Sequence, residues 1–179
     1  SWTGAETPLH RCRRQAPGAR TPRPSHIFYL VGPSHAQALF DAPYARLHLM
    51  EASERWRAEP HTFAIQNFLS AGMHSRPSLV SQILGIYDAN LELNEMQRFW
   101  HGTVASSLPV QLRRLGYRSE YWYGGWLNHG SMNHFVPAAG FDAYHEGPEI
   151  CPKGTPQTWL GVHDHFFLEA AAEMIREER

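Results

Sequence analysis

The chain has too few cysteines for a disulfide-stabilised fold, because Cys12 and Cys151 are the only two among its 179 residues. Neither cysteine has a neighbour at C-x-x-C spacing, which excludes a zinc-finger or dithiol redox motif. The sequence leaves two possibilities open for this pair, one bridge or two free thiols. Twelve histidines are present, but most are scattered through polar segments, as surface and hydrogen-bonding histidines usually are.

Long hydrophobic runs and charge of one sign are also lacking. No apolar run reaches the roughly 18 residues that a membrane-spanning helix needs. No basic stretch precedes an apolar one, so we expect a soluble chain without a signal peptide. The formal net charge is −1, which argues against bulk electrostatic binding of nucleic acid. The remaining composition, 42% hydrophobic, is typical of one globular domain with a core.

The start of the chain differs in composition from the rest. Residues 1–24 carry five arginines among prolines, glycines and threonines, which predicts a flexible lead-in. A single domain is expected over residues 25–179. Its first strand is predicted at residues 27–31, an apolar β-rich run that would be buried in a parallel sheet. Residues 36–57 are predicted to form helix and loop packed on that sheet.

The most informative stretch surrounds Ser75. An apolar segment at residues 63–69 predicts a second buried strand, and a short turn containing Gly72 follows it. Pro77 suits the first turn of a helix, whose apolar residues recur at helical spacing until Gly85. The sequence therefore predicts a strand, a turn, and a serine at a helix N-terminus.

A hydroxyl in that position has two interpretations. The unpaired N–H groups and the dipole of a helix N-terminus favour an anion or a developing alkoxide, and Arg76 adds positive charge. His74 and Arg76 could then orient anionic oxygens around Ser75. The alternative is that Ser75 is an ordinary N-cap, which stabilises a helix by about 1 kcal/mol.

The segment from Ser75 to Gly85 resembles the nucleophile segment of the alkaline phosphatase superfamily. It is most similar to the sulfatase-like domains of lipoteichoic acid synthases, other phosphoglycerol transferases, phosphoethanolamine transferases and sulfatases. This resemblance implies a three-layer α/β/α fold with a mainly parallel sheet. It also implies that Ser75 is the nucleophile and a ligand of a divalent metal (Mn, Ca, Mg or Zn). Arg76 and Leu79 depart from the sulfatase signature, which favours an unmodified serine over formylglycine.

A further departure affects the expected metal site. The family's first strand runs into Gly-Glu-Ser, whose carboxylate is a metal ligand, whereas this chain has Gly32, Pro33 and Ser34. Proline offers no side-chain oxygen, so the metal would lose a hard ligand. Ser34, His35 or Asp41 could substitute for it.

The second half of the chain carries the remaining resemblance. A helix is predicted from Ser106 to Gly116, followed by a strand at residues 120–123, and the intervening residues 87–99 are expected to be irregular. Beyond the carboxyl end of that strand, where ligands gather in open α/β sheets, lie Trp126, Asn128, His129 and Asn133. The resemblance implies substrate head-group contacts in this region, with Trp126, Asn128 and His129 as the candidates. The alternative is a packed aromatic loop.

Near the end, residues 159–164 match a family segment that opens a helix, with Asp164 as its predicted N-cap. His163, Asp164 and His165 could bind a metal, although capping and surface polarity explain them more simply. The family's Asp-His metal ligands lie on later strands that this sequence does not contain. We therefore expect the front part of such a domain, with an exposed sheet edge that needs the missing half or an oligomer partner.

The resulting hypotheses name different functions. The first is a phosphotransferase or hydrolase that uses Ser75 to act on an anionic phosphodiester, such as a lipid head group. We expect this chain to have weak catalytic activity or none. The second is a non-catalytic anion-binding remnant without a metal, and the third is a sulfuric ester hydrolase. A glycan hydroxyl or water would be the acceptor. The family also suggests an extracytoplasmic domain anchored to a membrane.

Overall fold

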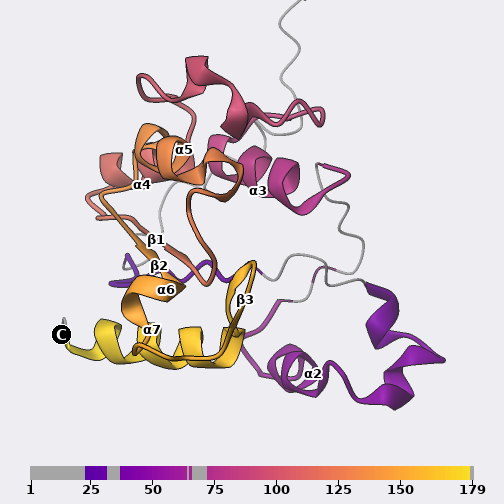
Figure 1. Cartoon of the computed structure of the whole chain (residues 1–179). Helices are drawn as coiled ribbons and strands as arrows, with labels where there is room; N and C mark the ends of the chain where they lie inside the picture. The colour runs from indigo at the N-terminus through magenta and orange to yellow at the C-terminus, as the bar shows by residue number, and fades with distance from the viewer. Residues whose placement is uncertain (1–22, 32–36, 64, 66–71, 178–179) are drawn as a thin grey trace, which may run out of the picture. The chain divides into compact units, whose positions relative to one another are not determined.

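A computed structural model describes residues 23–31, 37–63, 65 and 72–177 of the chain (Figure 1). The chain divides into two units, Ser1–Pro33 and Ser34–Arg179. Helices and short strands alternate along the second unit, which confirms the predicted α/β class. Among the helices of the described ranges, none is long and apolar enough to cross a membrane.

A parallel pair of strands forms the centre of the second unit. β1 (Glu120–Tyr123) pairs in parallel with β2 (Ala143–Glu146), and Tyr123 lies opposite Glu146. The connection between them contains the helical turn η5 (His129–Ser131) and the helix α5 (Met132–Ala139), as parallel pairing requires a crossover. The predicted strand 120–123 is confirmed, while β2 and α5 were not predicted as elements.

Helices cover both faces of this pair. Tyr121 and Tyr123 pack against a first hydrophobic cluster, and Trp122, which points the opposite way, packs against a second. The first cluster consists of buried side chains from Val80, Ile83, Leu84, Leu93, Leu127, Met132, Phe135, Val136 and Ala139. The second consists of Cys151, Val162 and Phe167. In the described part of the chain, β1 and β2 are the whole parallel sheet, so a larger mainly parallel sheet stays a prediction.

Two predicted helices are present with nearly the predicted bounds. α3 (Ser75–Leu84) ends at Gly85, whose φ of 65° is the left-handed conformation that glycine adopts at little cost. α4 (Leu108–Arg114) follows Ser107 and carries Pro109 in its first turn, where a missing N–H is harmless. The local signals in these two segments therefore agree with their tertiary surroundings.

The segment between α3 and α4 is more ordered than predicted. It contains two short 3-10 turns, η3 (Leu93–Glu95) and η4 (Gln97–Phe99). The carboxylate of Asp88, which is fully buried, accepts hydrogen bonds from the N–H groups of Glu92 (3.1 Å) and Leu93 (2.9 Å). A buried polar residue thus organises a segment that has no regular hydrophobic pattern.

The C-terminal part contains α6 (Gly147–Ile150), the antiparallel pair β3 (Gln157–Thr158) and β4 (Gly161–Val162), and α7 (Asp164–Glu177). Asp164 is the first residue of α7, not the capping residue before it, so the predicted cap is wrong by one position. The carbonyl oxygen of His163 accepts the N–H groups of Phe166 and Phe167 instead. Cys151 is a buried free thiol, and Cys12 lies outside the described residues.

The prediction of a buried strand at residues 27–31 is wrong. These residues form no strand, and the side chains of Ile27, Phe28, Tyr29 and Leu30 are more than half exposed. β propensity reflects how a side chain packs against neighbouring strands, and a run of β-formers without such neighbours remains irregular. The predicted lead-in falls mostly on residues 1–22, which lie outside the described residues.

Residues 36–57 were predicted to form helix and loop packed on a sheet, and η1 (Gln37–Phe40), η2 (Tyr44–Leu47) and α2 (Glu51–Arg57) do form in the described part. Met50 is buried, whereas Leu47, Leu49 and Trp56 are exposed, so the packing of this segment on a sheet stays a prediction. Of the predicted strand at residues 63–69, only Phe63 and Ile65 are described, and both are exposed and outside any strand.

Candidate functional site

The turn before α3 is fixed by contacts to the helix that it opens. The hydroxyl of Ser78 donates to the carbonyl oxygen of Gly72 at 3.0 Å, and the N–H of Met73 donates to Oδ1 of Asn90 at 2.8 Å. A Cβ atom on Gly72 would lie 2.7 Å from the backbone nitrogen of Ser78, so only glycine fits there without a backbone shift. The position of Ser75 is therefore set by the turn as well as by the helix.

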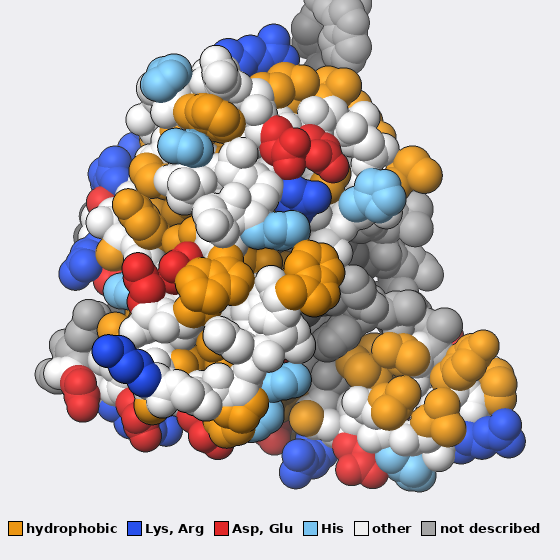
Figure 2. All heavy atoms as spheres, viewed as in Figure 1, with side chains coloured by type: hydrophobic (Ala, Val, Ile, Leu, Met, Phe, Trp, Pro, Cys, Tyr) orange, Lys and Arg blue, Asp and Glu red, His pale blue; other side chains and the backbone are white. Residues whose placement is uncertain are grey.

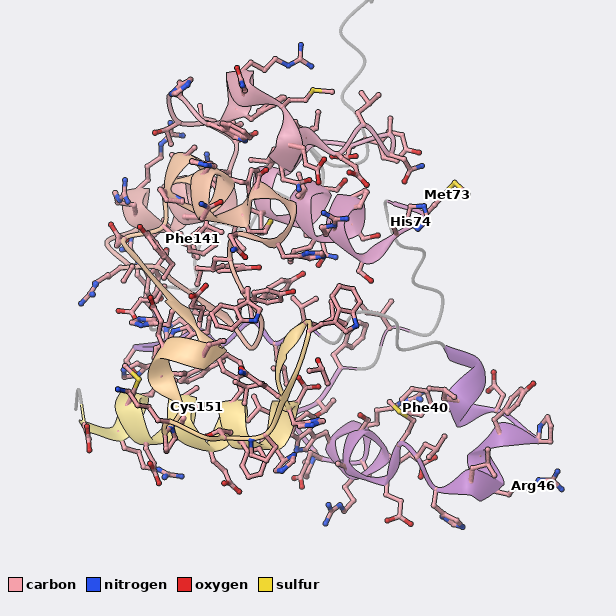
Figure 3. All side chains as sticks on the ribbon, in the orientation of Figure 1. Phe40, Arg46, Met73, His74, Phe141 and Cys151 are labelled. Atoms are coloured by element: carbon pink, nitrogen blue, oxygen red, sulfur yellow. The ribbon has the colours of Figure 1, made fainter. Side chains whose placement is uncertain are left out.

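Ser75 is exposed and is the first residue of α3. His74 occupies the N-cap position and its side chain makes no capping hydrogen bond. The structure thus places Ser75 one position inside the helix, and both interpretations of its hydroxyl stay predictions. Figure 3 shows the side chains of Met73 and His74 projecting outward from the start of this helix. Ser75 thus lies at the solvent-exposed N-terminus of a helix, the kind of position that favours an anion.

Arg76 links α3 to the loop that follows β1. A Cβ atom on Gly130 would collide with the guanidinium group of Arg76, which shows that this side chain lies directly on the Gly130 backbone. Burial raises the pKa of the Tyr123 phenol at the end of β1, and the charge of Arg76 lowers it in part. The start of α3 and the carboxyl end of β1 are therefore neighbours.

The positive charge of Arg76 already has a partner. Its Nη1 donates to Oε1 of Glu95 at 2.9 Å, and the two side chains are 37% and 44% exposed. An anion that binds at Ser75 would compete with Glu95 for this guanidinium group. Arg76 is consequently a weaker anion ligand than the sequence suggested.

The loop after β1 is held by three hydrogen bonds. The N–H of Leu127 donates to Oε2 of Glu146 at 2.7 Å, and the N–H of Asn133 donates to the carbonyl oxygen of Leu127 at 2.7 Å. Nδ2 of Asn94, a fully buried residue, donates to the carbonyl oxygen of Gly130 at 2.6 Å. These contacts tie the loop to β2, α5 and η3.

Two of the three predicted head-group residues line a hollow of about 360 Å³ at the carboxyl ends of β1 and β2. Its lining includes Trp126, Asn128, Asn133, Tyr144, Glu146 and Glu149. His129 is not part of this lining, and its ring packs edge-to-face against Trp159 with 5.9 Å between ring centroids. Ser75, His74 and Arg76 are likewise outside it.

Sequence reasoning missed Tyr144, Glu146 and Glu149. The sequence contained one indication of this arrangement. Tyr144 and Glu146 are two residues apart in a strand, so their side chains point to the same face of the sheet. Their proximity to Trp126, however, depends on the pairing of β1 with β2. Without that register, Glu146 would be read as an ordinary surface carboxylate.

The expected metal site can be tested only in part. Pro33, Ser34 and His35 lie outside the described residues. Within the described ranges, no group of three His, Cys, Asp or Glu side chains could hold a metal ion, and this includes the surroundings of Ser75 and of His163, Asp164 and His165. The described residues by themselves thus supply no such set, so the reasoning below uses the chain's own groups.

Comparison of the chain with known proteins identified no relative. The chain matches no family model, no curated protein and no solved structure.

Proposed function

We propose that residues 25–179 belong to a sulfatase-like domain of the alkaline phosphatase superfamily and use Ser75 as a nucleophile toward an anionic phosphodiester. The observation that carries the proposal is the exposure of Ser75 at the first residue of α3. The contact of Arg76 with Gly130 supports it, because the nucleophile helix then meets the loop after β1. Substrates gather at this edge of open α/β sheets.

In this proposal the Ser75 oxygen attacks the phosphorus atom of a phosphodiester. A bond forms between Oγ and phosphorus, the bond from phosphorus to the leaving oxygen breaks, and the serine proton goes to solvent or the departing alcohol. The N–H groups in the first turn of α3 stabilise the negative charge on the phosphoryl oxygens. A hydroxyl group of a glycan or a water molecule then attacks phosphorus and releases Ser75.

The family resemblance also calls for a divalent metal, which would neutralise the transferred group. The described residues do not supply the required ligands, and Pro33 offers no side-chain oxygen. We therefore expect slow turnover. The family further suggests an extracytoplasmic domain anchored to a membrane.

Trapping the covalent intermediate tests the proposal directly. The purified chain is incubated with bis(4-nitrophenyl) phosphate, and tryptic peptides are searched by mass spectrometry for a nitrophenyl phosphate adduct. We expect the adduct on Ser75, a stoichiometric release of nitrophenolate, and loss of both in Ser75→Ala. Ser53→Ala, a serine in α2, is the control and should behave as the unmodified chain does. No adduct on Ser75 at any time point contradicts the proposal.

A second candidate is binding of an anion without turnover. It is favoured by Pro33, which offers no side-chain oxygen at the position of the family's carboxylate ligand. Calorimetry with manganese or calcium distinguishes the two, because stoichiometric metal binding supports the enzyme and inorganic phosphate binding without metal supports the remnant. An unmodified mass at Ser75 argues against a formylglycine-dependent sulfuric ester hydrolase.

A further inference from the structure

The hollow at the carboxyl ends of β1 and β2 has a chemistry that Ser75 does not explain. Two carboxylates line it, Glu146 from β2 and Glu149 from α6. Within the described lining no lysine or arginine compensates these charges. An anionic group would be repelled there, whereas a cation would gain from both carboxylates.

Aromatic side chains complete the hollow. Trp126 comes from the loop after β1 and Tyr144 from β2, and they are 36% and 47% exposed. Aromatic faces attract cations, and organic ammonium groups are bound in this way next to carboxylates. Figure 2 shows acidic side chains beside large hydrophobic ones on the face over the sheet.

One of the two carboxylates, that of Glu146, is held in place before any ligand binds. Oε2 of Glu146 accepts the N–H of Leu127 at 2.7 Å, so this carboxylate has a defined orientation toward the loop that carries Trp126 and Asn128. Glu149 follows within the next helical turn, α6, and is exposed. A carboxylate that is already fixed in position loses less conformational entropy when a ligand binds than a mobile carboxylate does.

We propose that this hollow binds a small organic cation, a primary or methylated alkylammonium. Glu146 and Glu149 supply the negative charge, and Trp126 and Tyr144 supply the aromatic surfaces. Asn128 and Asn133 line the same hollow and can hydrogen-bond a hydroxyl group on the ligand. A bare metal ion fits less well, because the described residues hold no group of three suitable ligands. The inference does not rest on the function proposed for Ser75.

The test compares choline with 3,3-dimethylbutan-1-ol, which has the same shape but no charge. Binding is followed by ¹H–¹⁵N NMR on the side chains of Trp126, Asn128 and Asn133 at low ionic strength. We expect choline to shift these signals in a saturable manner and the neutral alcohol to shift them little. Added salt should weaken the effect, because exposed charges are screened.

Matched variants identify the groups responsible. Glu149→Gln keeps the shape and removes one charge, and should weaken choline binding by about fivefold. Trp126→Leu should weaken it by about two- to fivefold. Glu173→Gln on the exposed side of α7 and Trp56→Leu in α2 are controls for charge and for tryptophan, and should change nothing.

Three results would overturn the inference: no saturable shift with choline, equal shifts with the neutral alcohol, or unchanged binding in Glu149→Gln. Glucose is titrated in parallel, and preferential binding of this uncharged polyol would also overturn it. A thermal melt of each variant shows whether the fold is retained. The readout reports only on the hollow, so its outcome is separate from the adduct experiment on Ser75.

Discussion

The described residues within 23–63 and those within 72–177 contain similar kinds of apolar side chains but bury them to different extents. In the first region Phe28, Leu30, Leu49 and Trp56 are at least 60% exposed. In the second, Val80, Leu84 and Val136 are fully buried in one cluster. Hydrophobic content alone therefore does not create a core, since each apolar side chain needs a partner surface to pack against.

The second region also pairs several of its buried polar groups, although Oδ1 of Asn94 and the hydroxyl of Ser119 are buried without a hydrogen-bond partner. The Ser107 hydroxyl donates to the carbonyl oxygen of Ala139 at 2.6 Å, and the Asp142 carboxylate accepts the N–H of Ser119 at 2.8 Å. These bonds join α4 to α5 and anchor the chain before β2. Among the described residues of the first region, the guanidinium group of Arg57 lies over the ring of Phe40 at 4.6 Å.

The largest expected effect comes from emptying the core. Phe135 is 1% exposed in the first cluster, and Phe135→Ala should lower the free energy of unfolding by about 3–5 kcal/mol through lost burial and a cavity. Trp56→Ala, at a 60% exposed position, should change it by no more than about 0.5 kcal/mol. Urea denaturation measures both. A similar loss of unfolding free energy in the two variants would mean that Trp56 is packed in solution, and it would contradict the difference in burial between the two regions.

The next effect concerns a buried hydrogen bond. Ser107→Ala leaves the Ala139 carbonyl without its donor in a fully buried position, and should cost about 1–3 kcal/mol. Ser53→Ala in α2 is the control and should be close to neutral. Equal values for the two serines would show that the bond to Ala139 contributes nothing measurable.

A smaller effect should depend on pH. Hydrogen bonding from the Ser119 N–H, aided by Arg113, holds the pKa of Asp142 below its ordinary value of 3.8. The folded state therefore favours the charged carboxylate, whose contribution is complete above about pH 4. It is lost as the pH falls through the folded pKa. We expect Asp142→Asn to lower stability at pH 7 by about 1 kcal/mol and to show a weaker loss of stability below pH 4.

Unchanged acid sensitivity in Asp142→Asn would contradict this assignment. Glu173→Gln removes an exposed carboxylate on α7 and provides the comparison. Chemical denaturation between pH 2.5 and pH 7 separates the two variants.

The smallest effect is expected at the surface of the first region. Leu49 is 65% exposed, so Leu49→Ser should change the free energy of unfolding by less than about 0.5 kcal/mol. Leu84→Ser, at a fully buried position, should be strongly destabilising by the same measurement. A large effect of Leu49→Ser would show that a partner covers this residue in solution.

Short-range signals were sufficient for several elements. The Pro77 and Gly85 signals predicted α3, Pro109 and Gly116 predicted α4, and the strand at residues 120–123 was placed correctly. In each case the local preference and the tertiary environment favour the same conformation. α5 was missed because Pro137 lies inside it, where proline normally opposes a helix.

Part of the candidate site could also be predicted. The exposed position of Ser75 at the start of a helix and the location of Trp126 and Asn128 beyond a strand follow from the order of elements. The ion pair of Arg76 with Glu95 could not be predicted, because the two residues belong to different elements. The acidic residues of the hollow could not be predicted either, because the position of Glu146 depends on how β2 pairs with β1.

The sequence by itself determined the presence and approximate bounds of α3, α4 and β1, because helix caps, proline and glycine act over a few neighbouring residues. Only the tertiary structure decided that residues 27–31 form no strand, since a strand requires a hydrogen-bonded neighbour distant in sequence. The tertiary structure also placed Glu146 beside the loop of Trp126, through the pairing of Tyr123 with Glu146. The sequence specifies the chemical groups of the side chains, but tertiary packing determines which of these groups lie close together.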